Sequence, residues 1–130
     1  MYTEEFEKLV SDAFLRLSDK IKKKISNVAF LVEDDIRTRR YGEKNIKYQG
    51  LLLGLYEGIP QTKRGENYMN VLPDKITIFK NPIESICGND PEKIKEMVYQ
   101  VLWHEVGHHF GFGEEGIRQL ERKRFNKNDF

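Results

Sequence analysis

The chain has 130 residues, and its 22 basic and 21 acidic side chains nearly cancel to a formal net charge of +1. This balance gives no reason to expect nucleic acid or an anionic membrane as a partner. The single cysteine, Cys87, excludes an intrachain disulfide and fits a reducing compartment. No apolar run approaches the ~20 residues that a helix needs to cross a bilayer. We therefore expect one domain over residues 1–130, which is a monomer in the cytoplasm.

The first element is expected to be an amphipathic helix, because hydrophobic residues recur at helical spacing from Phe6 to Ile21. Thr3 is the predicted N-cap, and residues 22–24, all lysine, form the solvated end. In so short a chain the apolar stripe of this helix fits a core better than a partner helix.

Three apolar segments predict strands, over residues 27–32, 50–57 and 75–80. The first is apolar almost without interruption, which indicates burial on both of its faces. The second and third should form a hairpin with a long polar loop over residues 61–70. Residues 36–49 are polar and basic, so we expect a loop there as well.

A central helix is predicted to start at Asp90, which can cap it, with Pro91 in the first helical position. Hydrophobic residues at helical spacing then define a buried face: Ile94, Met97, Val98, Val101 and Leu102. Continued at the same spacing, this face reaches His104, Glu105 and His108. A short closing helix should follow over residues 114–121.

All three histidines of the protein lie near the end of this helix, in the segment Trp103–Glu115. His104, Glu105 and His108 form the pattern H-E-x-x-H, which places two imidazoles one turn apart on one helix face. Both rings could reach one zinc ion at the usual distance of about 2.0–2.1 Å. Glu105 could then take a proton from a zinc-bound water as a general base. His109 is rotated by about 100° from His108, so it should point elsewhere.

Two further residues extend the motif. Gly111 lies where a helix can end with a left-handed glycine, seven residues after His104. Glu114 lies ten residues after His104, at the position of the third ligand in the metzincin pattern H-E-x-x-H-x-x-G-x-x-(H/D/E). We therefore predict that His104, His108 and Glu114 bind one zinc ion per chain, with Glu105 as the catalytic residue. Glu115 is expected to face solvent.

Three segments, over residues 54–60, 72–79 and 103–111, resemble the small bacterial minimal zincin family of metallopeptidase-like proteins. The resemblance implies an α+β, zincin-like fold with a small sheet of about three strands, flanked by an N-terminal helix and a central active-site helix. It also implies a zinc-dependent hydrolase in which metal-activated water attacks a peptide carbonyl. The substrate would be a peptide or an unfolded protein.

Two other hypotheses stay open. The chain could be a noncatalytic zinc-binding or interaction module on a zincin scaffold, or a hydrolase of the same site chemistry that acts on a nonpeptide substrate. The larger metzincin clan usually has His or Asp where Glu114 stands, and it has a methionine after the motif. All three methionines of this chain precede the motif. These departures concern proteolysis and leave the prediction of zinc binding unchanged.

Overall fold

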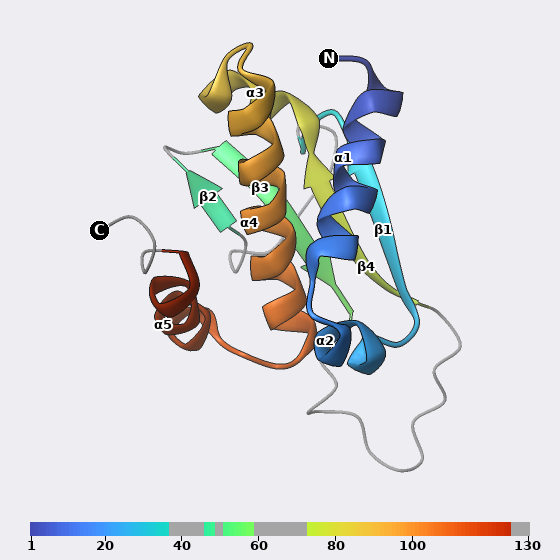
Figure 1. The fold of residues 1–130 in the computed structure, drawn as a ribbon, viewed down its shortest axis with the longest axis vertical. Coiled ribbons are helices and arrows are strands. Elements are labelled where there is room, and N and C mark those ends of the chain that lie inside the picture. Colours follow the sequence, from blue (N-terminus) through green and yellow to red (C-terminus); the bar gives the residue numbers. More distant parts are fainter. Residues whose placement is uncertain (37–45, 49–50, 59–72, 126–130) are drawn as a thin grey trace.

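The computed structural model describes residues 1–36, 46–48, 51–58 and 73–125, and the fold is α+β (Figure 1). Its elements, in chain order, are α1 (Thr3–Arg16), α2 (Asp19–Lys24), β1 (Val28–Glu33), β2 (Ile46–Tyr48), β3 (Leu51–Glu57), β4 (Asp74–Phe79), α3 (Lys80–Cys87), α4 (Pro91–His109) and α5 (Glu114–Phe125). Helices α1 and α4 pack against each other and against the sheet. The predicted fold class is confirmed, including the N-terminal helix and the central helix that carries the histidines.

The sheet has the strand order β1-β4-β3-β2. Strands β3 and β4 form the predicted antiparallel hairpin, with Gly54 opposite Ile78, and β1 pairs with β4 in parallel. The predicted polar loop over residues 61–70 lies outside the described residues. The sheet also gains a fourth strand, β2, inside the segment that was predicted to be only a loop. This strand has three residues, and among the described strands it pairs only with β3. So short an edge strand does not require the apolar pattern by which a strand is recognised in a sequence.

The prediction that the first strand is buried on both faces is wrong. Most of β1 is only half-buried, and Leu31 is 38% exposed. The reason is that β1 lies at the edge of the sheet formed by the described strands, where β4 is its one neighbour. Composition does not distinguish such an edge strand from a central one, because both can be rich in branched apolar residues.

The hydrophobic residues from Phe6 to Ile21, which were predicted to form the apolar stripe of one helix, belong to the two helices α1 and α2. The chain is extended at Leu17, and the Ser18 side chain then caps α2 by accepting a hydrogen bond from the Ile21 backbone N–H at 3.2 Å. Leu17 is 3% exposed and belongs to the same core as the helices, so the apolar spacing runs on through the break. The N-cap of α1 is Tyr2, which has no side-chain capping bond, and not Thr3 as predicted.

The start of α4 is as predicted, since Asp90 Oδ1 accepts hydrogen bonds from the backbone N–H groups of Glu92 and Lys93, at 3.1 and 3.4 Å. The buried face of α4 lies very close to β3. A Cβ added at Gly54 would lie 2.6 Å from Val101 Cγ1 and 3.2 Å from Glu105 Cγ. The missing side chain at Gly54 therefore allows the helix to approach the strand and places Glu105 directly above it.

We expect Gly54→Ala to lower the free energy of unfolding by about 1–3 kcal/mol, the usual effect of an extra methyl group in a packed core. Chemical denaturation in the presence of a chelator measures this. The matched control is Gly116→Ala in α5, where an added Cβ meets only ordinary contacts with Phe112 at 3.5 and 3.8 Å. The control should be neutral or up to about 1 kcal/mol more stable, because alanine favours a helix. Equal stability of both variants would contradict the close approach at Gly54.

None of the helices in the described ranges is both long enough and apolar enough to cross a membrane.

Candidate metal centre

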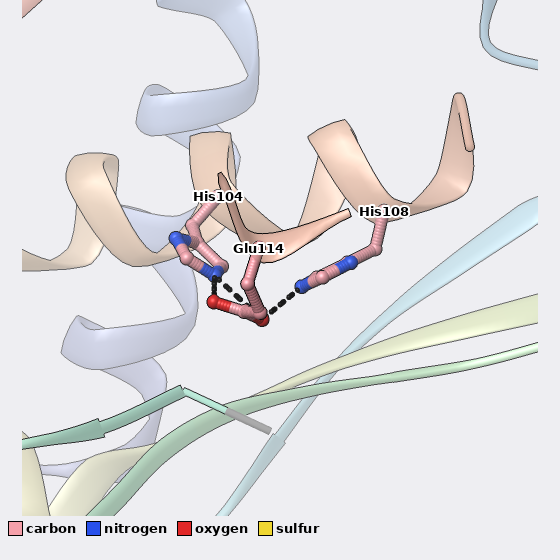
Figure 2. A group of neighbouring side chains, drawn as sticks. All are labelled: His104, His108 and Glu114. Carbon is pink, nitrogen blue, oxygen red and sulfur yellow. Dashed lines mark hydrogen bonds and ion pairs between the residues drawn. The ribbon is translucent and has the colours of Figure 1, made fainter. Parts of the chain in front are cut away.

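His104 and His108 lie on consecutive turns of α4, with their ring centroids 5.1 Å apart. His104 is buried, at 5% exposure, and His108 is partly buried. The Nε2 atoms of both rings face the carboxylate of Glu114, which lies between them (Figure 2). The helical spacing of the motif thus produces the shared face that it predicts.

The turn after α4 brings Glu114 to this position. The backbone N–H of Gly111 donates to the His108 carbonyl at 2.9 Å, and that of Phe112 donates to the Gly107 carbonyl at 3.1 Å. These two bonds form a Schellman motif, which requires a left-handed residue at the helix end. Gly111 has a φ of 93°, so the predicted left-handed glycine is confirmed. The chain then reverses, and α5 begins at Glu114.

The carboxylate of Glu114 is close to both imidazoles. Its Oε1 lies 2.7 Å from His108 Nε2 and 3.4 Å from His104 Nε2, and its Oε2 lies 3.3 Å from His104 Nε2. One donor atom from each of the three residues lies within 4.8 Å of the others. Tetrahedral zinc with bonds of about 2.0–2.1 Å holds its donors about 3.3–3.4 Å apart. The three residues therefore fit a zinc ion, and the His108–Glu114 contact would need to widen most.

The neighbouring residues Glu115 and His109 point away from this group. Glu115 has a 64% exposed side chain, as the sequence predicts, and it pairs with Arg118 on the surface of α5. His109 is fully buried, and its Nδ1 lies 2.9 Å from Asp74 Oδ2. The Tyr56 hydroxyl donates to the same oxygen at 2.7 Å. This network joins the C-terminal end of α4 to β3 and β4, so it fixes the helix that carries the other two histidines.

Glu105 is fully buried, and neither carboxylate oxygen has a hydrogen-bond partner of good geometry among the described residues. Burial raises the pKa of Glu105 from 4.5 to about 8, although the charge of His104 and the nearby backbone N–H of Tyr56 act in the opposite direction. Nearby Glu114 and Glu121 raise it further. Buried carboxyl groups without partners are uncommon and are concentrated at functional sites. A cation held by the adjacent residues would lower this pKa, because opposite charge favours the carboxylate.

Two contacts to the Nδ1 atoms of the histidines are not evident from the sequence. His104 Nδ1 lies 3.3 Å from Glu121 Oε2, and His108 Nδ1 lies 3.2 Å from the Phe112 carbonyl oxygen. Burial lowers the pKa of His104, but the hydrogen bond to Glu121 and the surrounding carboxylates outweigh burial and raise it above 6.5. The only signal in the sequence is that Glu121 follows Glu114 by two helical turns. That signal has meaning only once α5 is known to pack on α4.

A second glycine contact holds α5 in place. A Cβ added at Gly107 would lie 3.0 Å from Cγ1 of Ile117, which is itself fully buried. Because Gly107 has no side chain, Ile117 can pack against α4 at this position, within the H-E-x-x-H segment. Helix α5, predicted over residues 114–121, extends to Phe125. Both Glu114 and Glu121 reach the site from this one helix.

A small mixed sheet, a helix with the H-E-x-x-H pattern across it and an acidic residue returned by a glycine turn together define a zincin-type protein. Residues 25–124 match the family model of the zincin-like metallopeptidases, and the chain belongs to this family. The predicted assignment to the minimal zincins is thereby confirmed. The match starts at residue 25, so α1 and α2 lie before it. No curated protein matches the chain.

Proposed function

We propose that this protein is a zinc-dependent metallopeptidase-like hydrolase. In this proposal His104, His108 and Glu114 hold one zinc ion, and Glu105 is the general base. The observation that carries the proposal is the convergence of the three donor groups within 4.8 Å of one another. Membership of the family supports a metal, typically zinc, and a peptidase-like activity. Imidazole and carboxylate donors also suit zinc chemically.

A bound zinc ion would supply a Lewis acid that polarises the substrate carbonyl and makes an attacking water more acidic. The chain's own contribution is the proton transfer. Glu105 would accept the proton of the attacking water and pass it to the leaving amine. Burial by itself favours the protonated form of Glu105, so the base role relies on the charge of the bound ion, which would lower the pKa of Glu105 and favour the carboxylate. The proposed substrate is a peptide or an unfolded segment of protein.

Metal analysis of the protein purified without added metal tests the zinc site directly. We expect about one zinc per chain in the wild type, and loss of stoichiometric zinc in His104→Ala and His108→Ala, because each removes one of three donors. Glu115→Ala, which changes an exposed acid on α5, is the control and should retain zinc. Unchanged zinc in both histidine variants would refute the site.

Cleavage of a diverse peptide library then tests the activity. Cleavage that a chelator abolishes supports the metallopeptidase. A zinc-loaded protein that cleaves no peptide would instead support the alternative, a noncatalytic zinc-binding or interaction module on a zincin scaffold.

Three properties stay predictions from the sequence: the single domain over residues 1–130, the monomeric state and the cytoplasmic location.

A further inference from the structure

We propose that Glu121 is a positioning residue for the metal centre: it holds the His104 ring with Nδ1 protonated, so that Nε2 presents its lone pair to the ion. This inference rests on the proposed zinc site and adds Glu121 to the four side chains already assigned to it, His104, His108, Glu114 and Glu105. Glu121 does not itself belong to the group of donor atoms that could hold the metal.

The geometry around His104 carries the argument. Its Nδ1 lies 3.3 Å from Glu121 Oε2, and its Nε2 lies 3.3 Å from Glu114 Oε2 on the opposite side of the ring. An ionised carboxylate can only accept hydrogen bonds, so each of these two contacts favours a proton on the nitrogen that it faces. If Glu114 binds the ion instead, only the contact with Glu121 remains, and it favours the tautomer with the proton on Nδ1. A neutral imidazole with its proton on Nδ1 leaves Nε2 free to bind a metal.

His108 has the same arrangement with a different acceptor. Its Nδ1 lies 3.2 Å from the Phe112 carbonyl oxygen, and its Nε2 faces Glu114. In both histidines Nδ1 thus lies near a hydrogen-bond acceptor, and Nε2 faces the position between the two rings where the Glu114 carboxylate lies. For His108 the acceptor is a backbone group that the turn after α4 fixes. For His104 it is a side chain, so it can be removed by substitution.

Helix α5 places Glu121 where it can act on His104. Glu114, Ile117 and Glu121 recur at helical spacing and therefore lie on one face of α5. The middle residue, Ile117, is fully buried and packs against Gly107 of α4. This contact sets the distance between the helices and brings Glu121, with a 27% exposed side chain, against the ring of His104.

The expected effect on metal binding follows from the role of such partners. A carboxylate that accepts a hydrogen bond from the non-ligating nitrogen of a metal-bound histidine fixes the ring orientation and raises the basicity of the ligating nitrogen. Loss of such a carboxylate typically weakens metal affinity 10–100-fold. We expect Glu121→Ala to weaken zinc binding by about this factor in competition with a chelator of known affinity. Glu121→Gln retains an oxygen that can accept from Nδ1 and should recover most of the affinity. Glu115→Ala is the control on the same helix and should bind zinc as the wild type does.

A second measurement separates the role of Glu121 from the zinc site itself. The zinc-free Glu114→Ala variant has no carboxylate at position 114 that could accept a hydrogen bond from His104 Nε2. In this variant, nitrogen NMR at a pH above the pKa of His104 reports which ring nitrogen carries the proton. We expect the proton on Nδ1, and a shift of its population toward Nε2 when Glu121→Ala is added. Such a shift of the proton would show that Glu121 orients the His104 ring, whether or not the wild type binds zinc. Absence of zinc from the wild type would refute the proposed metal centre, and it would leave this effect of Glu121 on the ring in place.

Three results would overturn the inference. One is zinc affinity in Glu121→Ala equal to that of the wild type. Another is an unchanged proton position on His104 after the same substitution. Weakened affinity in Glu121→Ala that Glu121→Gln does not recover would also count against it, because a hydrogen-bond acceptor would then not be what matters. Thermal unfolding of each zinc-free variant shows whether the fold is retained.

Discussion

Glu105→Gln is expected to retain one zinc per chain and to lose at least ~100-fold in peptide hydrolysis, the usual scale for removal of a general base. Glutamine has almost the same shape, so it should fit the buried site above Gly54. It cannot accept the proton of the attacking water. Zinc content and the rate on a peptide that the wild type cleaves measure the two effects. Full activity in this variant would place the base elsewhere.

Glu105→Gln should also change how the free energy of unfolding of the zinc-free protein depends on pH. In the folded chain the pKa of Glu105 is raised from 4.5 to about 8, so between these values the native state holds a proton that the unfolded state releases. The free energy of unfolding should therefore fall as pH rises through this window, by up to about 1.4 kcal/mol per pH unit, and level off above it.

Glu105→Gln removes this contribution while the other titrating groups stay. With a chelator present, the stability difference between Glu105→Gln and the wild type should therefore grow in favour of the variant from pH 5 to pH 8. Denaturant unfolding over a pH series measures it. A constant difference across the series would show that Glu105 is not buried in its neutral form.

The second large effect is expected at Glu114. Glu114→Ala should weaken zinc binding by at least ~100-fold, because it removes a direct donor, and even indirect partners of a metal site contribute 10–100-fold. It should lower thermal stability only when zinc is present, since ligand binding adds to the stability of the folded state. A 100-fold weaker dissociation constant corresponds to about 2.7 kcal/mol of that added stability.

Glu115→Ala is the matched control, one residue further along α5. Its side chain is 64% exposed and pairs only with arginines and a glutamine of the same helix in the described structure. We expect wild-type zinc affinity and wild-type stability in both the presence and absence of zinc. The reverse pattern in the two variants would refute the assignment of Glu114.

The local sequence alone was sufficient to predict much of the candidate site. The spacing of His104 and His108 places them on one face because a helix turns every 3.6 residues, and this holds whatever surrounds the helix. Gly111 ends α4 in a left-handed conformation that few other residues adopt. These two local facts are enough to return the chain toward the histidines at Glu114. Capping by Asp90 is local in the same sense.

Other features of the fold depend on contacts between distant segments, and the sequence predicted them poorly. The break between α1 and α2 does not interrupt the apolar stripe, because both helices pack on one core. The exposure of β1 depends on its place at the sheet edge. Strand β2 exists through its pairing with β3, and its own composition does not indicate it.

The tertiary structure alone decided how the site is supported. Glu105 acquires its raised pKa from burial against β3, which the absence of a side chain at Gly54 allows. Glu121 reaches His104 because Ile117 packs on Gly107 and sets the position of α5. The three candidate ligands can be recognised by spacing within one helix and turn. The residues that we propose to tune and orient them come from separate elements, and their contacts exist only after the elements have packed together.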